Sequence, residues 1–148
     1  MEVEKEGHSQ YFKNAIVTGS AGFIGFHVSK RLLEEGWRVC GIDCLTPYYD
    51  INIKKKRNQI LSNFRNYNFY NKNLEDSIEI TEIFEEVKPS IVIHLAAQAG
   101  VRYSLYDPRK FMDSNLIGTF NVLEASKKME CDHFLMASSS SVYGENES

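Results

Sequence analysis

Cysteine is scarce in this sequence, and its scarcity excludes two kinds of scaffold. The chain has only Cys40, Cys44 and Cys131, an odd number without the paired short spacings of a zinc site. A framework of disulfides would need more cysteines than this. We therefore expect reduced thiols, as in the cytoplasm, and no metal centre.

Long apolar runs and a strong excess of one charge are missing as well. No stretch approaches the roughly 18 to 20 apolar residues that cross a bilayer, and no apolar segment follows a basic start at the N-terminus. The formal net charge is only -3, and nothing in it indicates a nucleic-acid-binding protein. These absences predict a soluble, cytoplasmic protein with neither a membrane nor a nucleic acid as partner.

A length of 148 residues corresponds to about one domain, which at this size buries roughly two thirds of its unfolded surface. Residues 1–13 are polar and aperiodic, and we expect them to form a flexible extension. The folded domain is then expected to occupy residues 14–148.

Short β-branched runs alternate with longer amphipathic segments through this domain, which is typical of a parallel sheet with crossover helices. The expected strands are residues 15–18, 38–43, 67–71, 91–96 and 133–137. The sequence thus predicts an α/β fold, a doubly wound parallel sheet of five strands that is incomplete at its C-terminal end.

The helices between these strands show apolar residues three and four positions apart. Gly36 is expected to end the first helix, and Asp76 or Ser77 to cap the third. In the last helix Asp107 is expected as the N-cap, with Pro108 at the first helical position. The apolar face of that helix is expected to carry Phe111, Asn115, Phe120 and Leu123.

Three glycines stand three positions apart between the first strand and its helix: Gly19, Gly22 and Gly25. The first permits a tight turn, the second lets the backbone approach a pyrophosphate, and the third lets helix and strand pack closely. The N-terminus of the helix then offers N–H groups and a positive dipole end to phosphates. A purely structural turn is the alternative, but the order of strand, turn and helix favours a dinucleotide-binding, or Rossmann, domain.

Asp43 closes the second strand 18 residues beyond Gly25, near the spacing at which a carboxylate meets an adenosine ribose. Such a carboxylate accepts hydrogen bonds from a free 2′-hydroxyl but repels a 2′-phosphate. No arginine follows Asp43 directly. We therefore predict a dinucleotide site that prefers NAD to NADP.

Several segments carry a resemblance to a known family. Residues 19–25 (GSAGFIG) have a glycine spacing that resembles the short-chain dehydrogenases, and their extended branch of nucleotide-sugar enzymes in particular. Four further segments resemble the uronate 4-epimerases: Tyr48-Tyr49-Asp50 with Lys54 and Arg57 after it, residues 94–104 (HLAAQAGVRYS), residues 113–119 (DSNLIGT) and residues 138–144 (SSSSVYG). The resemblance covers residues 14–148. Cys44 in place of asparagine, and Pro47 before the tyrosines, depart from the family pattern.

The resemblance implies an NAD-dependent isomerase that epimerises C4 of a UDP-sugar, most simply UDP-glucuronate, through a 4-keto intermediate. It implies a homodimer for the full-length protein. The residues that it assigns to the cofactor are Gly19, Gly22, Phe23, Ile24, Gly25 and Asp43, with Ala96 and Ala97 flanking it and Asn73 and Leu74 near the adenine. It assigns a catalytic role to Ser139, which would hydrogen-bond the 4-oxygen of the sugar.

The catalytic base of the family is the tyrosine of a Tyr-x-x-x-Lys pair on the helix after the fifth strand, and the sequence reaches Ser148 without such a pair after that strand. Tyr143 is not that tyrosine, because Glu147 stands where the lysine would be. The resemblance therefore implies that the chain is inactive by itself. Another UDP-hexose 4-epimerase and a non-catalytic NAD-binding domain are the alternative functions.

Other side chains have a structural and a functional interpretation. His94 is expected to be a satisfied core histidine without a chemical role. The run from Lys54 to Arg57 is either a solvated helix face or part of the nucleotide-sugar site. Asn115 either links a neighbouring loop or lies near the cofactor, and Arg102 is either a surface charge or a contact for substrate or cofactor phosphates.

Ser140 and Ser141 stand where related sugar 4,6-dehydratases have an acid pair and where uronate decarboxylases have a glutamate before Val-Tyr-Gly. Neither hydroxyl acts as a carboxylate base near neutral pH, so dehydration is not expected. The hypothesis is that these two serines hold the carboxylate of a uronate substrate by hydrogen bonds.

Overall fold

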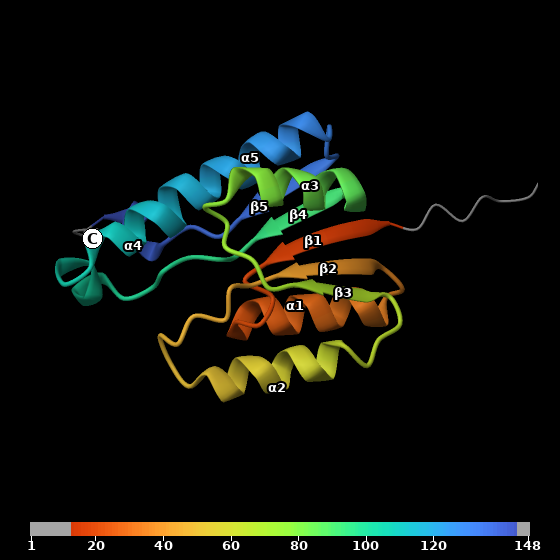
Figure 1. Ribbon diagram of the computed structural model, residues 1–148, viewed down its shortest axis with the longest axis horizontal. Helices are drawn as coiled ribbons and strands as arrows, with labels where there is room; N and C mark the ends of the chain where they lie inside the picture. Colours follow the sequence, from red (N-terminus) through yellow and green to blue (C-terminus); the bar gives the residue numbers. More distant parts are fainter. Residues whose placement is uncertain (1–12, 145–148) are drawn as a thin grey trace, which may run out of the picture.

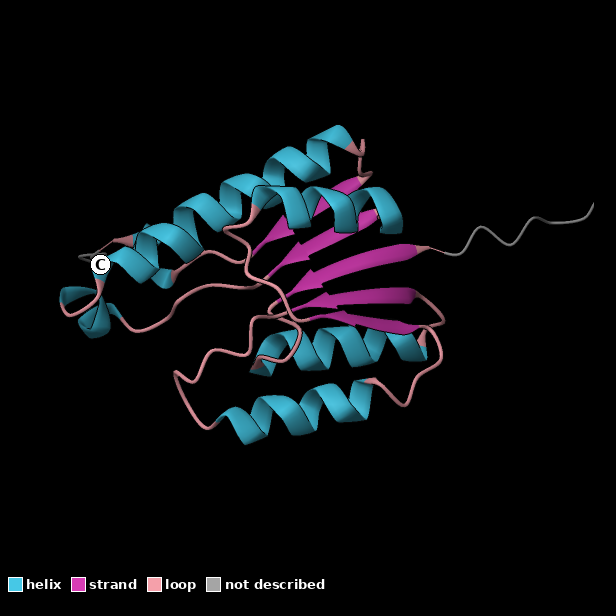
Figure 2. Cartoon of the chain, in the orientation of Figure 1, coloured by secondary structure: helices cyan, strands magenta, loops and turns pink. Residues whose placement is uncertain are grey.

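The chain folds as one parallel sheet between two layers of helices. A computed structural model describes residues 13–144, and the predicted extension and the last four residues lie outside this part, apart from Lys13. The strands are β1 (Asn14–Thr18), β2 (Arg38–Ile42), β3 (Tyr67–Tyr70), β4 (Ile91–His94) and β5 (His133–Met136). They pair in parallel in the order β3-β2-β1-β4-β5. Figure 2 shows this twisted layer with helices on both sides.

The helices cover both faces of the sheet. Their bounds are α1 (Phe23–Glu34), α2 (Ile51–Leu61), α3 (Ser77–Val87), α4 (Pro108–Phe111) and α5 (Thr119–Lys128), with the 3-10 helices η1 (Val101–Leu105) and η3 (Ser140–Tyr143) and the π-helical segment η2 (Met112–Gly118). Helices α1 and α2 cover one face, and α3 and α5 cover the other (Figure 1). The predicted doubly wound architecture is confirmed.

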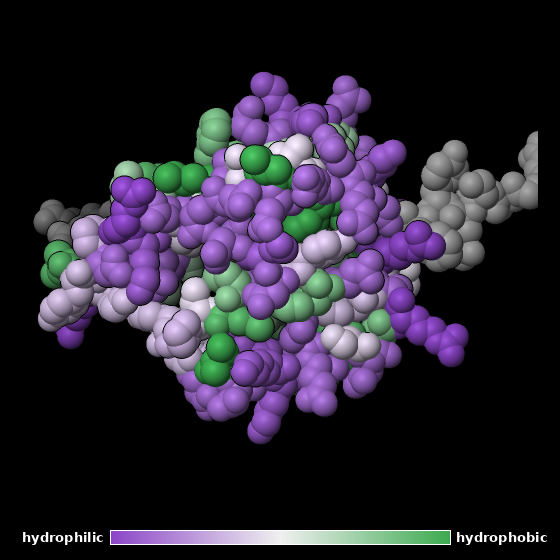
Figure 3. Space-filling model, viewed as in Figure 1, coloured by the Kyte–Doolittle hydropathy of each residue, from purple (hydrophilic) through white to green (hydrophobic). Residues whose placement is uncertain are grey.

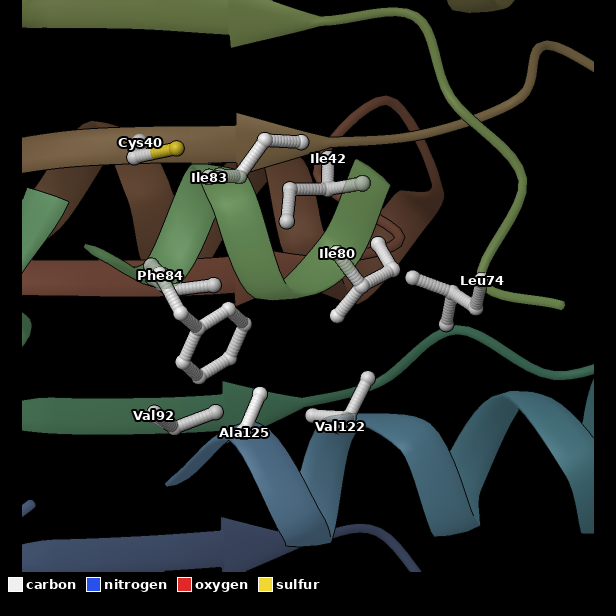
Figure 4. Packing of buried hydrophobic residues seen from close by; sticks show 10 residues of the cluster. Cys40, Ile42, Leu74, Ile80, Ile83, Phe84, Val92, Val122 and Ala125 are labelled. Atoms are coloured by element: carbon white, nitrogen blue, oxygen red, sulfur yellow. The ribbon is translucent and has the colours of Figure 1, made fainter. Parts of the chain in front are cut away.

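Successive side chains of β1 point to opposite faces of the sheet, and the core is accordingly divided into two parts. Ala15 and Val17 pack toward α1 and α2 with Leu33 and Leu61. Ile16 belongs to the other part, which fills the space between the sheet, α3 and α5. The buried residues of that part, drawn in Figure 4, include Ile42, Ile80, Phe84, Val92 and Val122. Alternate residues of one strand therefore fix both helical layers onto the sheet.

The helix ends follow the expected capping chemistry. The carboxylate of Asp76 accepts from the backbone N–H groups of Ile78 and Glu79 at 3.1 and 3.0 Å. Asp107 caps α4, which has proline at its start. Gly36, with φ +86°, follows α1. The strands lie where they were predicted to within one or two residues at each end.

The predicted apolar face of the last helix is wrong, and η2 gives the reason. A π-helical turn contains more residues than an α-helical turn and so changes which side chains face the sheet beyond it. Phe120 and Leu123 are 61% and 42% exposed. Val122 and Ala125 point into the core instead. A uniform helical period along the sequence does not anticipate this shift.

Polar residues cover most of the face seen in Figure 3, and hydrophobic residues form scattered patches on it. At the sheet edge, β5 has Leu135 and Met136 46% and 53% exposed. None of the helices within residues 13–144 has the length and apolar character needed to cross a membrane.

Candidate nucleotide-binding site

A cleft of about 640 Å³ opens at the carboxyl ends of the strands. Its walls come from the segments that follow β1, β2, β3 and β4, which all leave the same edge of the sheet (Figure 1). The chain turns to opposite faces after β1 and β4, although these strands are neighbours. Ligands of doubly wound sheets bind in such a crevice, and the volume is within the roughly 300 to 1,000 Å³ of small-molecule sites.

The three glycines lie at the floor of this cleft, at positions where a Cβ atom would come too close to neighbouring backbone atoms. Gly19 has φ +70°, and a Cβ there would lie 2.9 Å from the backbone nitrogen of Ala96. A Cβ on Gly22 would lie 3.0 Å from the carbonyl oxygen of Gly19, and one on Gly25 only 2.1 Å from the same oxygen. The first two glycines line the cleft, whereas Gly25 is buried beneath the loop and lets α1 start close to the sheet.

The first turn of α1 is left open toward the cleft. Its N-cap, Gly22, provides no side-chain cap, and no acidic residue stands in the first turn. Unsatisfied N–H groups and the positive end of the helix dipole are therefore presented beside Phe23, which lines the cleft. This is the arrangement that binds phosphate groups at helix N-termini.

Asp43 lies at the end of β2, on the cleft wall, and is 6% exposed. One carboxylate oxygen, Oδ2, accepts from the backbone N–H of Ala21 at 3.2 Å. The other, Oδ1, accepts from the N–H of Leu45 at 2.8 Å. The carboxylate thus reaches the glycine loop directly, which the spacing in the sequence only implied.

The basic run that begins α2 is divided between solvent and cleft. Lys55 and Lys56 are exposed, as expected of a solvated helix face. Lys54 is 8% exposed and forms an ion pair with Asp43, with 3.2 Å between Nζ and Oδ1. Arg57 also lines the cleft and donates to the carbonyl oxygen of Ala21 at 3.4 Å. In the sequence, the family motif that begins at Tyr48 singles out Lys54 and Arg57.

His94 is buried, as predicted, at the end of β4. Its ring lies between two threonine hydroxyls, with Thr18 at 2.7 Å and Thr119 at 2.9 Å. The Oγ1 atom of Thr18 also accepts from the N–H groups of Leu95 and Ala96, both at 3.1 Å. Burial lowers the pKa of His94 to about 4, so the ring is neutral at pH 7. This network fixes the start of the segment that forms one wall of the cleft.

Asn115 shows the structural link that was one of its two interpretations. Its Oδ1 accepts from the backbone N–H of Gln98 at 2.7 Å, and its Nδ2 donates to the carbonyl of Gln98 at 3.0 Å. The amide of Asn115 thus joins the π-helical segment η2 to the cleft-lining loop that follows β4. Asn115 does not itself line the cleft.

The structure brings most of the predicted cofactor residues together and separates the others. The cleft lining contains Gly19, Gly22, Phe23, Asp43, Asn73, Leu74, Ala96 and Ala97. Ile24 is 59% exposed outside the cleft. Arg102 in η1 and Ser139 after β5 are exposed and also lie outside the cleft lining. The side chains of Ser140 and Ser141 lie outside the described residues.

Sequence reasoning missed several residues of the cleft wall. They include Thr46, Tyr49, Gln98, Lys110 and Ser114. They come from loops, from α4 and from η2, where no period in the sequence marks the side that faces the cleft. Within residues 13–144 no three histidine, cysteine or acidic side chains gather as a metal site.

A second hollow, of about 370 Å³, lies at the opposite edge of the sheet, where β1, β2 and β3 begin. Asn14, Arg38 and Asn66 are among its lining residues. It has neither a glycine loop nor the N-terminus of a helix in its lining, so it shares none of the features that make the first cleft a nucleotide site.

The sequence profile of one protein family, GDP-mannose 4,6 dehydratase, matches residues 16–148. The chain belongs to this family. The matched range includes the glycine loop, Asp43 and the serine cluster. The predicted resemblance to the nucleotide-sugar branch of the short-chain dehydrogenases is confirmed.

Several proteins to which the chain is similar are named epimerases. A Rhizobium meliloti protein named "Probable UDP-glucuronate 4-epimerase" is 48% identical over 132 residues, which are 89% of this chain and 39% of that protein. The crystal structure of a Bacillus cereus UDP-glucuronic acid 4-epimerase with UDP-glucuronic acid and NAD is 32% identical, with a TM-score of 0.83 over 91% of this chain and 43% of that one.

A Thermotoga maritima UDP-glucose 4-epimerase, solved with UDP-glucose, is 37% identical, with a TM-score of 0.76 over 91% of this chain and 41% of that one. The chain therefore spans about two fifths of the length of the relatives that it matches.

Proposed function

We propose that this chain is the NAD-binding part of a UDP-sugar 4-epimerase, and that the sugar is UDP-glucuronate, which becomes UDP-galacturonate. The observation that carries the proposal is the convergence of the glycine loop, the open N-terminus of α1 and Asp43 on one cleft. The epimerase names of the relatives support it, and the Bacillus cereus structure was solved with NAD.

The residues present fit a dinucleotide. Gly19 and Gly22 leave room where a Cβ would meet backbone, so a pyrophosphate can approach the loop and the N–H groups of α1. Asp43 would accept a hydrogen bond from the adenosine ribose, with Asn73 and Leu74 near the adenine. Ala96, which donates to the hydroxyl of Thr18, and its neighbour Ala97 would flank the other end of the cofactor.

Bound NAD would supply a hydride acceptor, so that the 4-hydroxyl of the sugar becomes a ketone and is then reduced from the opposite face. The chain would orient the cofactor and the ketone. Ser139 would donate a hydrogen bond to the 4-oxygen, and the base for the 4-hydroxyl would be the tyrosine of a Tyr-x-x-x-Lys pair after the fifth strand, which does not occur between residues 137 and 148.

The substrate assignment depends on Ser140, Ser141 and Arg102. A 4-keto uronate loses carbon dioxide readily, so an epimerase must hold the C5 carboxylate in a position that disfavours this loss. We assign that task to the hydroxyls of Ser140 and Ser141, which form hydrogen bonds without acting as base or acid. Arg102 would contact a phosphate of the nucleotide. A cytoplasmic homodimer is the proposed state of the whole enzyme.

The alternative substrates are other UDP-hexoses, because the Thermotoga maritima structure contains UDP-glucose. The experiment is a chimaera in which this chain is followed by the C-terminal part of the Rhizobium meliloti relative. With UDP-glucuronate and NAD, UDP-galacturonate as the main product supports the proposal. UDP-xylose or a UDP-4-keto-pentose as the main product would overturn the proposed epimerase activity. Turnover of UDP-glucose alone would overturn the assignment of UDP-glucuronate as the substrate.

The remaining alternative is a non-catalytic NAD-binding domain. The same chimaera distinguishes it, since such a domain would bind NAD in a calorimetric titration while the chimaera turned over no UDP-sugar. We expect the 148-residue chain alone to bind NAD weakly and to give no turnover.

A further inference from the structure

The ion pair between Lys54 and Asp43 changes what the carboxylate offers to a cofactor. The two side chains are 10% and 4% exposed, and Nζ lies 3.2 Å from Oδ1. A lysine is rarely buried unless it is paired. Lys54 comes from the first turns of α2, and both residues line the same cleft. The position expected to meet the adenosine ribose is therefore held by a carboxylate together with an ammonium group.

The hydrogen-bonding capacity of Asp43 is largely used within the protein. Its Oδ1 accepts from Leu45 N–H at 2.8 Å and from Lys54, and its Oδ2 accepts from Ala21 N–H. A carboxylate has about four acceptor positions, so about one remains, on Oδ2. Asp43 can therefore accept from one ribose hydroxyl but not from two. The ammonium group of Lys54 has three N–H donors and can donate to the second hydroxyl.

The charge at this position also differs from that of a lone aspartate. An aspartate excludes a 2′-phosphate because both carry negative charge. Here Lys54 cancels the charge of Asp43 at contact distance. Arg57 adds a further positive charge, and its side chain donates to two neutral oxygens, those of Tyr49 and Ala21.

The other charged residues of the cleft lining do not reverse this balance. Lys72 is paired with Glu79, and Lys110 with Asp107. Glu75 is the second carboxylate on the lining, and its charge is matched by that of Arg57. A 2′-phosphate would thus meet a lining without net negative charge instead of a lone carboxylate.

We propose that Lys54 is a specificity-determining residue of the dinucleotide site: it shares the ribose with Asp43 and weakens the exclusion of a 2′-phosphate. The ratio of the dissociation constant of NADP to that of NAD is then smaller than Asp43 alone would give. The inference rests on the proposed function, because it takes the cleft to be an NAD site.

The test is calorimetric titration of the whole chain with NAD and with NADP, and the quantity compared is the ratio of the two dissociation constants. In Lys54→Met the ratio, NADP over NAD, is expected to rise on the order of tenfold, because one nearby positive charge has been removed. Lys54→Arg keeps the charge and should keep the ratio. Lys55→Met is the matched control, since it removes the same charge from an exposed position on the same helix.

Replacing Lys54 removes the partner of a buried carboxylate and can impair folding. The ratio of the two dissociation constants is measured for this reason, because both ligands bind the same folded molecules. Lys54→Gln, which keeps a hydrogen-bond donor but no charge, replaces Lys54→Met if the latter does not fold. An unchanged ratio, or the same change in Lys55→Met, overturns the role of Lys54 while NAD binding itself stands. A chain that binds neither nucleotide overturns the proposed function, and the inference with it.

Discussion

The hydroxyl of Thr18 donates its hydrogen bond to Nδ1 of His94. Its oxygen already accepts from two backbone N–H groups, those of Leu95 and Ala96, so its one hydrogen must point to the ring nitrogen 2.7 Å away. His94 therefore carries its proton on Nε2, which donates to the hydroxyl of Thr119. A second proton on the ring would face the hydrogen of Thr18, so the network requires a neutral imidazole.

This requirement predicts how stability depends on pH. The pKa of His94 is lowered to about 4 by burial, against about 6.5 in an unfolded chain. The unfolded state therefore binds the proton first as the pH falls, and stability that is complete above about pH 6.5 is lost toward pH 4. Urea unfolding should show this loss, about 2 kcal/mol between pH 7 and pH 5 from this group.

In His94→Asn the amide oxygen still accepts from Thr18, but no group titrates in this range. The variant should be less stable than the wild type at pH 7 and should show a smaller loss between pH 7 and pH 5. An identical pH dependence in the two proteins would contradict the assignment.

Gly25→Ala should destabilise the chain more than Gly22→Ala. The new Cβ would lie 2.1 Å from the carbonyl oxygen of Gly19 in the first variant and 3.0 Å in the second. Backbone must move in the first case, at a cost of about 1 to 3 kcal/mol or more for overpacking. Thermal unfolding without nucleotide measures the difference. Equal melting temperatures would mean that α1 can shift away from β1 without cost.

Asp43→Asn should destabilise the chain even when no nucleotide is present. The amide can place its oxygen toward Leu45 and Lys54, but its NH2 group then faces the N–H of Ala21, and Lys54 loses the negative charge of its partner. The expected loss is about 1 to 3 kcal/mol in urea unfolding. Asp50→Asn is the matched control, because it makes the same change at an exposed N-cap where asparagine serves equally well.

Ser139→Ala in the chimaera should lower turnover of UDP-glucuronate on the order of 100-fold to 1,000-fold with little change in KM, since one positioned donor is removed. Ser138→Ala provides a neighbouring control. If Ser139→Ala keeps full turnover, the role passes to Ser140 or Ser141.

The sequence predicted the strands and the glycine loop because local chemistry decides them. The β-branched runs, the caps at Asp76 and Asp107 and the glycine spacing each act within a few residues of chain. The proximity of Asp43 to the loop followed from parallel pairing, since β1 and β2 end at the same sheet edge.

The burial of Lys54 and the rotation of α5 did not follow from the sequence, because distant contacts decide them. The family motif named Lys54 but not its burial, which depends on where α2 places it relative to Asp43. The π-helical segment η2 changes which residues of α5 face the sheet, and no local pattern in the sequence marks it.

The hydrogen bond from Ala21 to Asp43 also bears on how cofactor preference can evolve in this chain. The simplest route from NAD to NADP is to replace the ribose carboxylate, yet here the same carboxylate fastens the phosphate loop. A mutation at position 43 would alter selectivity and weaken the loop in a single step, and selection would act against it. Lys54 donates to Asp43 and not to the phosphate loop, so a change at position 54 alters selectivity while the hydrogen bond from Ala21 stays in place.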